Sequence, residues 1–163
     1  MHSEGTFNIR VYGLLINAQN KILLSDEYAL STYMTKFPGG GLEYGEGTLD
    51  CLKREFKEEL ALDIKIESHF YTTDFFQSAI FFENTQLISI YYLVSSPEVS
   101  KITTTNTPFN FPKKEGSQAF RWVAIKDLTT ETVTFPIDKI VIQKLKEQFI
   151  PLTNQNGITS PPQ

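Results

Sequence analysis

The spacing of apolar residues along the chain predicts short strands separated by two helices. Valine, isoleucine, leucine and the aromatic residues gather in short runs bounded by turn-forming residues, as they do in strands of a folded sheet. We predict strands over 7–16, 21–25, 63–74, 86–95 and 119–125. Two longer segments, 48–60 and 137–149, place apolar residues on one side at helical spacing, and we predict an amphipathic helix in each.

The connections between these elements complete the predicted fold. Residues 17–20 form a turn, so the first two strands should return on each other as a hairpin. We predict a polar connection over 28–36 and a long, partly mobile surface loop over 100–117. Residues 153–163 are polar and contain proline, which is typical of a disordered tail. The order of elements indicates one α/β domain over 1–152, with a mixed sheet flanked by helices.

The predicted helix over 48–60 has an apolar side, which includes Phe56, and a separate acidic side. Thr48 is in the position of a helix N-cap. The acidic side is an arc of about 100° that holds Glu55, Glu58 and Glu59. A solvated helix face is one explanation, but such faces usually place opposite charges three or four residues apart, and here the neighbours of Glu55 repel it. Clustered carboxylates are hard oxygen donors, so we predict a site for Mg²⁺ or Mn²⁺.

Composition narrows the class of protein. The 163 residues suit one hydrophobic core, and the net charge of −4 argues against a protein that coats nucleic acid. No apolar run is long enough to span a membrane, and residues 1–6 lack the features of a signal peptide. The single cysteine, Cys51, cannot form an internal disulfide, so a reducing, cytoplasmic setting is expected. We expect Cys51 to be a small buried residue under the helix rather than a reactive thiol.

From Gly40 onward the chain resembles the Nudix box, G-x5-E-x7-R-E-U-x-E-E-x-G-U, in which U is a bulky apolar residue. The matching positions are Gly40, Glu46, Arg54, Glu55, Phe56, Glu58, Glu59 and Leu62. The chain departs from the pattern at Ala61, where the family usually has a glycine that closes the helix in a left-handed conformation. This departure removes no charge and no metal ligand.

The resemblance implies an α/β/α sandwich, and a metal-dependent hydrolase that cleaves the phosphoanhydride bond of a nucleoside diphosphate linked to another moiety. In the family, the box glutamates and the carbonyl of the residue before the first glycine bind the metal. The implied metal ligands are therefore Gly39, Glu55, Glu58 and Glu59. The same glutamates and Arg54 are the implied catalytic residues, and Arg54 would orient the helix by pairing with Glu46 or with a metal-binding glutamate. Glu43 is a further candidate for holding the loop.

Three further predictions concern the small-molecule nucleotide substrate. Arg10, on the first strand, is a candidate contact for an anionic substrate, with a solvated arginine as the alternative. Glu115 precedes the strand that contains Trp122 and is the candidate for a late catalytic acid, with a solvated loop glutamate as the alternative. Four phenylalanines could stack on a base, or could belong to the core or to the interface of a homodimer; they are Phe75, Phe76, Phe81 and Phe82.

Two function classes follow from these observations. The first is a metal-dependent pyrophosphohydrolase, and the second is a Nudix-like module that senses or binds a nucleotide without hydrolysing it. The intact R-E-F-K-E-E sequence at 54–59 favours the enzyme, and the sequence lacks the DNA-binding domain with which sensors often pair. We also expect no membrane partner. The choice among diphosphate substrates is not determined by the sequence.

Overall fold

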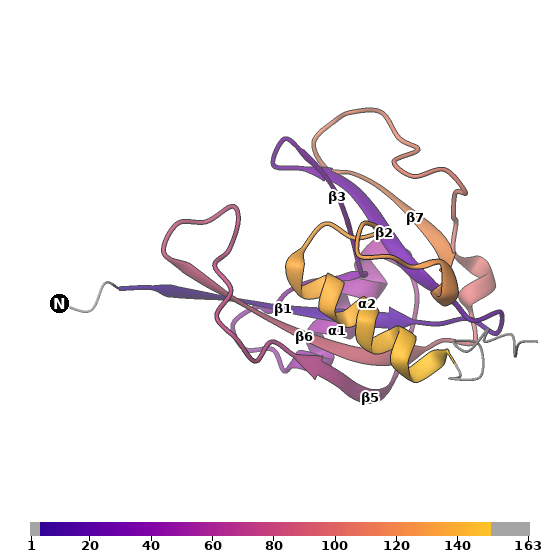
Figure 1. Cartoon of the computed structure of the whole chain (residues 1–163), viewed down its shortest axis with the longest axis horizontal. Helices are drawn as coiled ribbons and strands as arrows, with labels where there is room; N and C mark the ends of the chain where they lie inside the picture. Colours follow the sequence, from indigo (N-terminus) through magenta and orange to yellow (C-terminus); the bar gives the residue numbers. More distant parts are fainter. Residues whose placement is uncertain (1–3, 151–163) are drawn as a thin grey trace, which may run out of the picture.

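The computed structural model describes residues 4–150, which form strands and two α-helices (Figure 1). The strands are β1 (Thr6–Leu15), β2 (Lys21–Ala29), β3 (Thr32–Lys36), β4 (Gly39–Gly41), β5 (Lys65–Thr72), β6 (Thr85–Ser95) and β7 (Ser117–Ala124). The helices are α1 (Thr48–Leu60) and α2 (Pro136–Phe149), with the short 3-10 helices η1 (Val99–Lys101) and η2 (Ile125–Asp127). Both predicted α-helices are confirmed almost to the residue. The predicted tail and the domain boundary at 152 lie outside the described residues.

The strands divide between two sheets. The larger sheet has the order β4-β1-β6-β5, and β1 runs parallel to β6 with Val11 opposite Ile90. Its other two pairs, β1 with β4 and β5 with β6, are antiparallel, so this sheet is mixed. The smaller sheet, β3-β2-β7, is antiparallel throughout.

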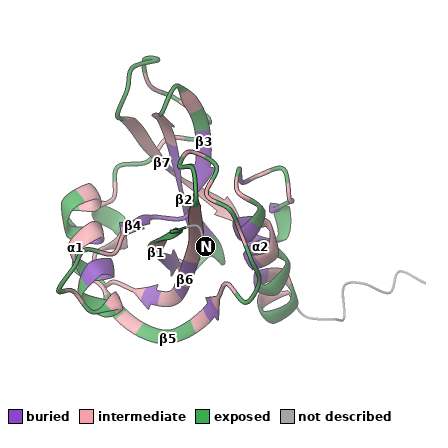
Figure 2. Cartoon of the chain, turned by 90° about the vertical axis from the view of Figure 1, so that its left-hand side faces the viewer, coloured by how far each residue is buried: buried purple, intermediate pink, exposed green. Residues whose placement is uncertain are grey.

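The two helices cover opposite sides of the strands (Figure 2). Side chains on β1 alternate between two hydrophobic clusters because successive residues of a strand point to opposite faces. Val11 and Leu15 pack in the cluster that contains Phe56 of α1, whereas Tyr12 and Leu14 pack in the cluster that contains α2 residues. A strand buried on both faces explains why this stretch is apolar without interruption. The predicted α/β/α sandwich with a mixed sheet is confirmed.

Two predicted connections are wrong. The first two strands do not form a hairpin: β2 pairs with β3 and β7, and only an isolated bridge between Ile16 and Ile22 joins the ends of β1 and β2. Residues 28–36 are not a polar connection, because they hold the end of β2 and all of β3. Thr35 and Lys36 are polar but buried, since acidic residues of β2 provide their partners. Polarity therefore misled the sequence prediction for this strand.

Two smaller expectations also change. The N-cap of α1 is Gly47, not Thr48, and no side chain caps the helix. The Thr48 hydroxyl instead pairs with the hydroxyl of Tyr92 at 2.8 Å, a partner that only the tertiary structure supplies. The loop over 100–117 lies at the surface as predicted, but it is tied to the smaller sheet, for example through the Gly116 amide, which donates to the Tyr28 carbonyl. Among residues 4–150, no helix is long and apolar enough to cross a membrane.

Helix α1 ends at Ala61, the position at which the box usually has glycine. Ala61 has φ 51° and ψ 31°, so it adopts the left-handed conformation despite its Cβ atom. Its amide donates to the Lys57 carbonyl, and the Leu62 amide donates to the Phe56 carbonyl. The bond from Ala61 to Lys57 is the one that defines the αL type of helix end, which usually has a glycine at this position. The substitution therefore keeps the helix end but leaves it conformationally strained.

The strain at Ala61 predicts a stabilising substitution. Ala61→Gly should raise the free energy of unfolding by about 0.5–1 kcal/mol, because glycine adopts this conformation without a steric cost. Urea denaturation of both proteins would measure the difference. Ala18→Gly is the matched control, since Ala18 lies in an exposed turn and is not among the residues with positive φ. There the added chain entropy of the unfolded state should lower stability slightly. An equal or lower stability for Ala61→Gly would contradict the assignment of strain.

Candidate active site

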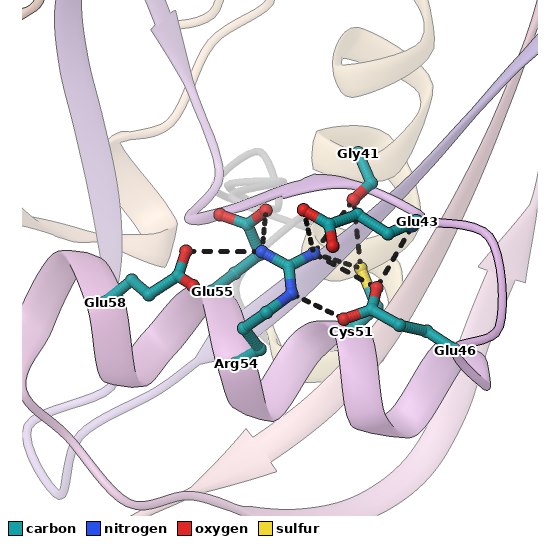
Figure 3. A network of polar contacts seen from close by, with 7 residues as sticks. All are labelled: Gly41, Glu43, Glu46, Cys51, Arg54, Glu55 and Glu58. Atoms are coloured by element: carbon teal, nitrogen blue, oxygen red, sulfur yellow. Dashed lines mark hydrogen bonds and ion pairs between the residues drawn. The ribbon is translucent and has the colours of Figure 1, made fainter.

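Arg54 holds the acidic helix against the loop that precedes it (Figure 3). Its Nε donates to Glu46 at 2.5 Å, and its Nη2 donates to the second oxygen of Glu46 at 3.1 Å. The same Nη2 donates to the Gly41 carbonyl at 3.1 Å. Glu43 lies at the edge of this group, 3.9 Å from the guanidinium. The predicted pairing of Arg54 with Glu46 is confirmed, and the Arg54 hydrogen bonds hold the pKa of Glu46 at about 2.

Arg54 also faces two of the predicted metal ligands. Its Nη1 donates to Glu55 at 3.0 Å and to Glu58 at 3.2 Å. The guanidinium therefore neutralises part of the negative charge on the acidic side of α1. Cys51 lies under this group with no exposed surface, and burial raises the pKa of its thiol to about 11. A thiol with a raised pKa is a poor nucleophile at neutral pH, so Cys51 is the small buried residue that the sequence predicted.

The glycines of β4 let the strand approach the acidic helix closely. A Cβ atom on Gly40 would lie 2.2 Å from an oxygen of Glu55. A Cβ atom on Gly39 would lie 2.1 Å from the Val11 carbonyl oxygen, and its φ of 145° is also unfavourable for other residues. Only glycine fits at position 39, where the overlap is with backbone, whereas a Cβ atom at position 40 would displace the Glu55 carboxylate. The Glu55 carboxylate consequently lies directly against the backbone of β4, next to the peptide that follows Gly39.

Glu59 faces a different set of groups from Glu55 and Glu58. It lines a cavity of about 160 Å³ together with Glu27 of β2 and with Gly116 and the first two residues of β7. Burial raises the pKa of Glu59 to about 7, while the nearby Lys36 opposes this and Glu27 adds to it. Lys36 is itself buried and bonded to Glu27 at 3.0 Å. A buried cation thus lies within electrostatic reach of the acidic helix.

The carboxylates of α1 suit a divalent cation in chemistry, but they do not converge in this structure. Within residues 4–150, no three acidic, histidine or cysteine side chains come together as a metal-binding group. Arg54 holds Glu55 and Glu58, and Glu59 points toward the smaller cavity. The donor set nevertheless fits Mg²⁺ or Mn²⁺, since it combines carboxylate oxygens with a glycine backbone that no Cβ atom blocks.

A larger cavity of about 210 Å³ lies beside this group, between β1, β2, α2 and the segment before β6. Its inner wall is polar and includes Arg10, Lys36, Glu27 and Asp138. Its outer wall is apolar, and Leu30, Ile80 and Phe82 there are each more than half exposed. Glu27 lines both cavities, so the two are adjacent. This division into polar and apolar walls is typical of a small-molecule site.

The predicted substrate contacts have different surroundings. Arg10 faces the larger cavity, and its Nε donates to the Tyr12 hydroxyl at 2.7 Å. Phe81 and Phe82 line the same cavity, whereas Phe76 is largely exposed away from it. The carboxylate of Glu115 accepts hydrogen bonds from the backbone amides of Leu30 and Ser31, at 2.9 and 2.7 Å. Glu115 is therefore neither a free loop residue nor part of the group around Arg54.

Three residues of the cavities were missed by the sequence analysis: Glu27, Lys36 and Asp138. Asp138 is 1% exposed, and its Oδ1 accepts a hydrogen bond from the Tyr91 hydroxyl at 2.6 Å. Its Oδ2 is buried without a hydrogen-bond partner in the part of the chain that the structure describes. Burial raises the pKa of Asp138 to about 7, although Tyr91 and Lys36 oppose this. Lys36 and Asp138 are charged residues in otherwise apolar stretches of the sequence. This was the available signal that they belong to a site.

Comparison with known proteins agrees with this geometry. The family model described as NUDIX domain matches residues 6–145. The ORF135 protein of E. coli has the same fold with a TM-score of 0.63, at 16% identity over 88% of this chain and 91% of that one. A MutT protein from Methanosarcina mazei Go1 superimposes with a TM-score of 0.62, at 15% identity over 90% and 97% of the two chains. A structure from work on MutT of Aliivibrio salmonicida and Vibrio cholerae superimposes with a TM-score of 0.57, at 20% identity over 88% of this chain and 100% of that one.

The family match spans nearly all of the described chain, and it contains every residue of the glycine strand, the Arg54 group and the acidic helix. The structural neighbours are too distant in sequence to transfer a substrate, but they share the arrangement of strands and helices. The chain therefore belongs to the Nudix family, with the fold and the intact acidic helix of a Nudix pyrophosphohydrolase.

Proposed function

We propose that this protein hydrolyses a phosphoanhydride bond in a nucleoside diphosphate linked to another moiety, with Mg²⁺ or Mn²⁺ as cofactor. The observation that carries the proposal is the position of the acidic helix. It lies between the glycine backbone of β4, which Glu55 contacts, and the adjacent cavities, which Glu59 approaches. A diphosphate could therefore reach the carboxylates of α1 while its organic part occupies the larger cavity.

Glu55, Glu58, Glu59 and the carbonyl of Gly39 would hold the cation. When bound, it would supply positive charge that neutralises the phosphoryl oxygens and activates water. Arg54 keeps the helix at a fixed distance from β4, since it bonds to both Glu46 and the Gly41 carbonyl. The box glutamates orient the attacking water and accept its proton.

Two cations lie between the acidic helix and the larger cavity. Lys36 is buried and acts electrostatically on both Glu59 and Asp138. Arg10 lines the same cavity wall and lies within electrostatic reach of Glu27 and Glu55. An anionic diphosphate would bind most favourably in this region, because Glu27 neutralises only part of the positive charge there. Lys36 is thus a second cation in the region where Arg10 is predicted to bind the substrate.

The larger cavity would hold the nucleoside. Phe81, Phe82 and Tyr12 provide aromatic surface. The Oδ2 atom of Asp138, which has no partner in the described part of the chain, provides a polar group at the inner end. A heterocycle with polar atoms on its edge matches this combination better than an alkyl group does, because an alkyl group would leave the buried carboxyl unpaired. We infer that Asp138 contacts the edge of the base.

The cofactor assignment predicts where a metal binds. In crystals soaked with Mn²⁺, anomalous density should appear beside Glu55, Glu58 and Glu59, because these carboxylates share one side of α1 and are hard oxygen donors. Substrate panels of nucleoside triphosphates, nucleotide sugars and dinucleotides, assayed first with Mg²⁺ and then with Mn²⁺, should show turnover only with metal. Metal bound elsewhere at millimolar concentration, with this group empty, would remove the basis for the assignment.

The catalytic role of the helix predicts that charge removal is costly. Glu58→Gln and Glu59→Gln keep the side-chain shape, and each should lower kcat by about tenfold to a thousandfold. Glu147→Gln is the matched control, since it makes the same change at an exposed position of α2. The folded state should remain intact by circular dichroism in all three variants. Nucleotide binding without turnover in the wild-type protein would instead favour a sensing module.

Asp138 predicts a pH-dependent stability. Its pKa of about 7 in the folded protein lies above the ordinary value of 3.8, so the folded state keeps a proton that the unfolded chain loses. The free energy of unfolding should therefore fall as pH rises from about 4 to 7, by up to about 1.4 kcal/mol per unit from this group.

Asp138→Asn should flatten that dependence, because the amide does not titrate. Urea denaturation at pH 5 and pH 8 would measure the change, with Asp127→Asn as the exposed control. Glu59 titrates in both proteins, so the difference between them isolates Asp138. Parallel pH profiles for Asp138→Asn and wild type would show that the carboxyl is ionised throughout.

A further inference from the structure

The tip of the β2–β3 hairpin has an unusual backbone for its sequence. Leu30 and Ser31 connect the paired residues Ala29 and Thr32, and their φ angles are 51° and 57°. Two successive left-handed residues define the type I′ turn, which matches the twist of a hairpin and normally contains asparagine or glycine. The Cβ atoms of leucine and serine make this conformation sterically unfavourable. Some other interaction must hold the turn in place.

Glu115 supplies that interaction from a distant part of the chain. Its Oε2 accepts the Leu30 amide at 2.9 Å and its Oε1 accepts the Ser31 amide at 2.7 Å, so both carboxylate oxygens are used. Adjacent amides in a turn form a concave site that favours an anion. The next residue, Gly116, donates its amide to the Tyr28 carbonyl and continues into β7. The long loop therefore lies beside the hairpin, as Figure 1 shows.

The hairpin tip also forms part of the substrate region. Leu30 and Ala29 line the larger cavity, and Leu30 is 54% exposed, as expected at its mouth. Residues 116–118, which directly follow Glu115, line the smaller cavity together with Glu59. Glu115 thus bonds to a turn that forms part of the wall of the larger cavity. It also directly precedes residues 116–118, which line the smaller cavity beside Glu59.

We propose that Glu115 is a positioning residue, which holds Leu30 and Ser31 in the left-handed turn so that Leu30 forms the outer wall of the nucleoside cavity. It acts on substrate binding through the hairpin and does not touch the reacting phosphates. The energy of the two charge-assisted hydrogen bonds offsets the steric cost of the turn. The kinetic part of this proposal rests on the proposed hydrolase function, whereas its structural part does not.

This role differs measurably from that of a late catalytic acid, which the sequence also suggested for Glu115. A catalytic acid acts on the chemical step, so its removal lowers kcat. A positioning residue for the cavity wall acts on binding, so its removal raises KM. Glycine at position 31 adopts a left-handed backbone without steric cost, and it provides no carboxylate. It can therefore repair a turn but cannot replace an acid.

The experiment compares Glu115→Ala, the double variant Glu115→Ala/Ser31→Gly, and Glu131→Ala, which removes an exposed carboxylate elsewhere. Amide hydrogen exchange and methyl signals of Leu30 and Ile80 are recorded by NMR on the free proteins. Kinetics are measured with ATP, GTP, CTP and UTP in the presence of Mg²⁺. In Glu115→Ala, the Leu30 and Ser31 amides should exchange at least about tenfold faster, because local opening costs less.

The same variant should raise KM about three- to tenfold, the cost of ordering a loosened wall on binding, with kcat nearly unchanged. The double variant should return KM and the methyl signals toward the wild-type values, and Glu131→Ala should change none of these readouts. A fall in kcat that Ser31→Gly does not repair would overturn the proposal in favour of a catalytic acid.

The free-protein measurements separate this proposal from the proposed function. If none of the four nucleotides is hydrolysed by the wild-type protein, only the hydrolase proposal loses support. The positioning role is then decided by the NMR signals alone. Unchanged amide exchange and unchanged Leu30 and Ile80 signals in Glu115→Ala would overturn it, whereas changes that Ser31→Gly reverses would support it.

Discussion

The close approach of the acidic helix to the glycine strand is the constraint on which the rest of the site depends. Arg54 maintains it, because a single guanidinium bonds to the loop at Glu46, to the helix at Glu55 and to the strand at the Gly41 carbonyl. The planar fork of donors on arginine suits such a role, and lysine could not make these contacts together. A Cβ atom on Gly40 would overlap the Glu55 carboxylate and displace it from the strand.

Charge changes in a regular order from the helix to the cavity. The carboxylates of α1 come first, the cations Lys36 and Arg10 follow, and the buried carboxyl of Asp138 lies at the inner end. Glu27 joins these regions, because it lines both cavities and bonds to Lys36. A substrate with an anionic middle and a polar, flat end is complementary to this order. The electrostatic pattern thus supports the same substrate class as the shape of the cavity does.

Several features of the site are unfavourable for stability. Asp138 is buried, with one oxygen that has no partner among residues 4–150, and Glu59 has a pKa raised by burial. Leu30 and Ser31 hold left-handed backbone conformations that leucine and serine rarely adopt. These costs lie around the two cavities, and the strain at Ala61, at the end of α1, is separate from them. Local strain and buried polar groups that persist in a folded protein are often maintained because a ligand uses them.

The sequence by itself determined the helices, the acidic side of α1, the glycine segment before it and the family, because each depends on residues within about two dozen positions of one another. That the glycines form a strand was decided by the tertiary structure. Helical periodicity placed Glu55, Glu58 and Glu59 on one side before any fold was known. The pairing of Arg54 with Glu46 was also predictable, since both belong to the same local motif.

The tertiary structure alone decided how the strands pair and which residues surround the cavities. The parallel pairing of β1 with β6 and the bond between Glu115 and the hairpin tip join segments that are far apart in the chain. Lys36 and Asp138 could not be predicted as neighbours, because β3 and α2 have no local pattern that relates them. Their charge state follows from burial and from partners on other elements, and the folded chain creates both.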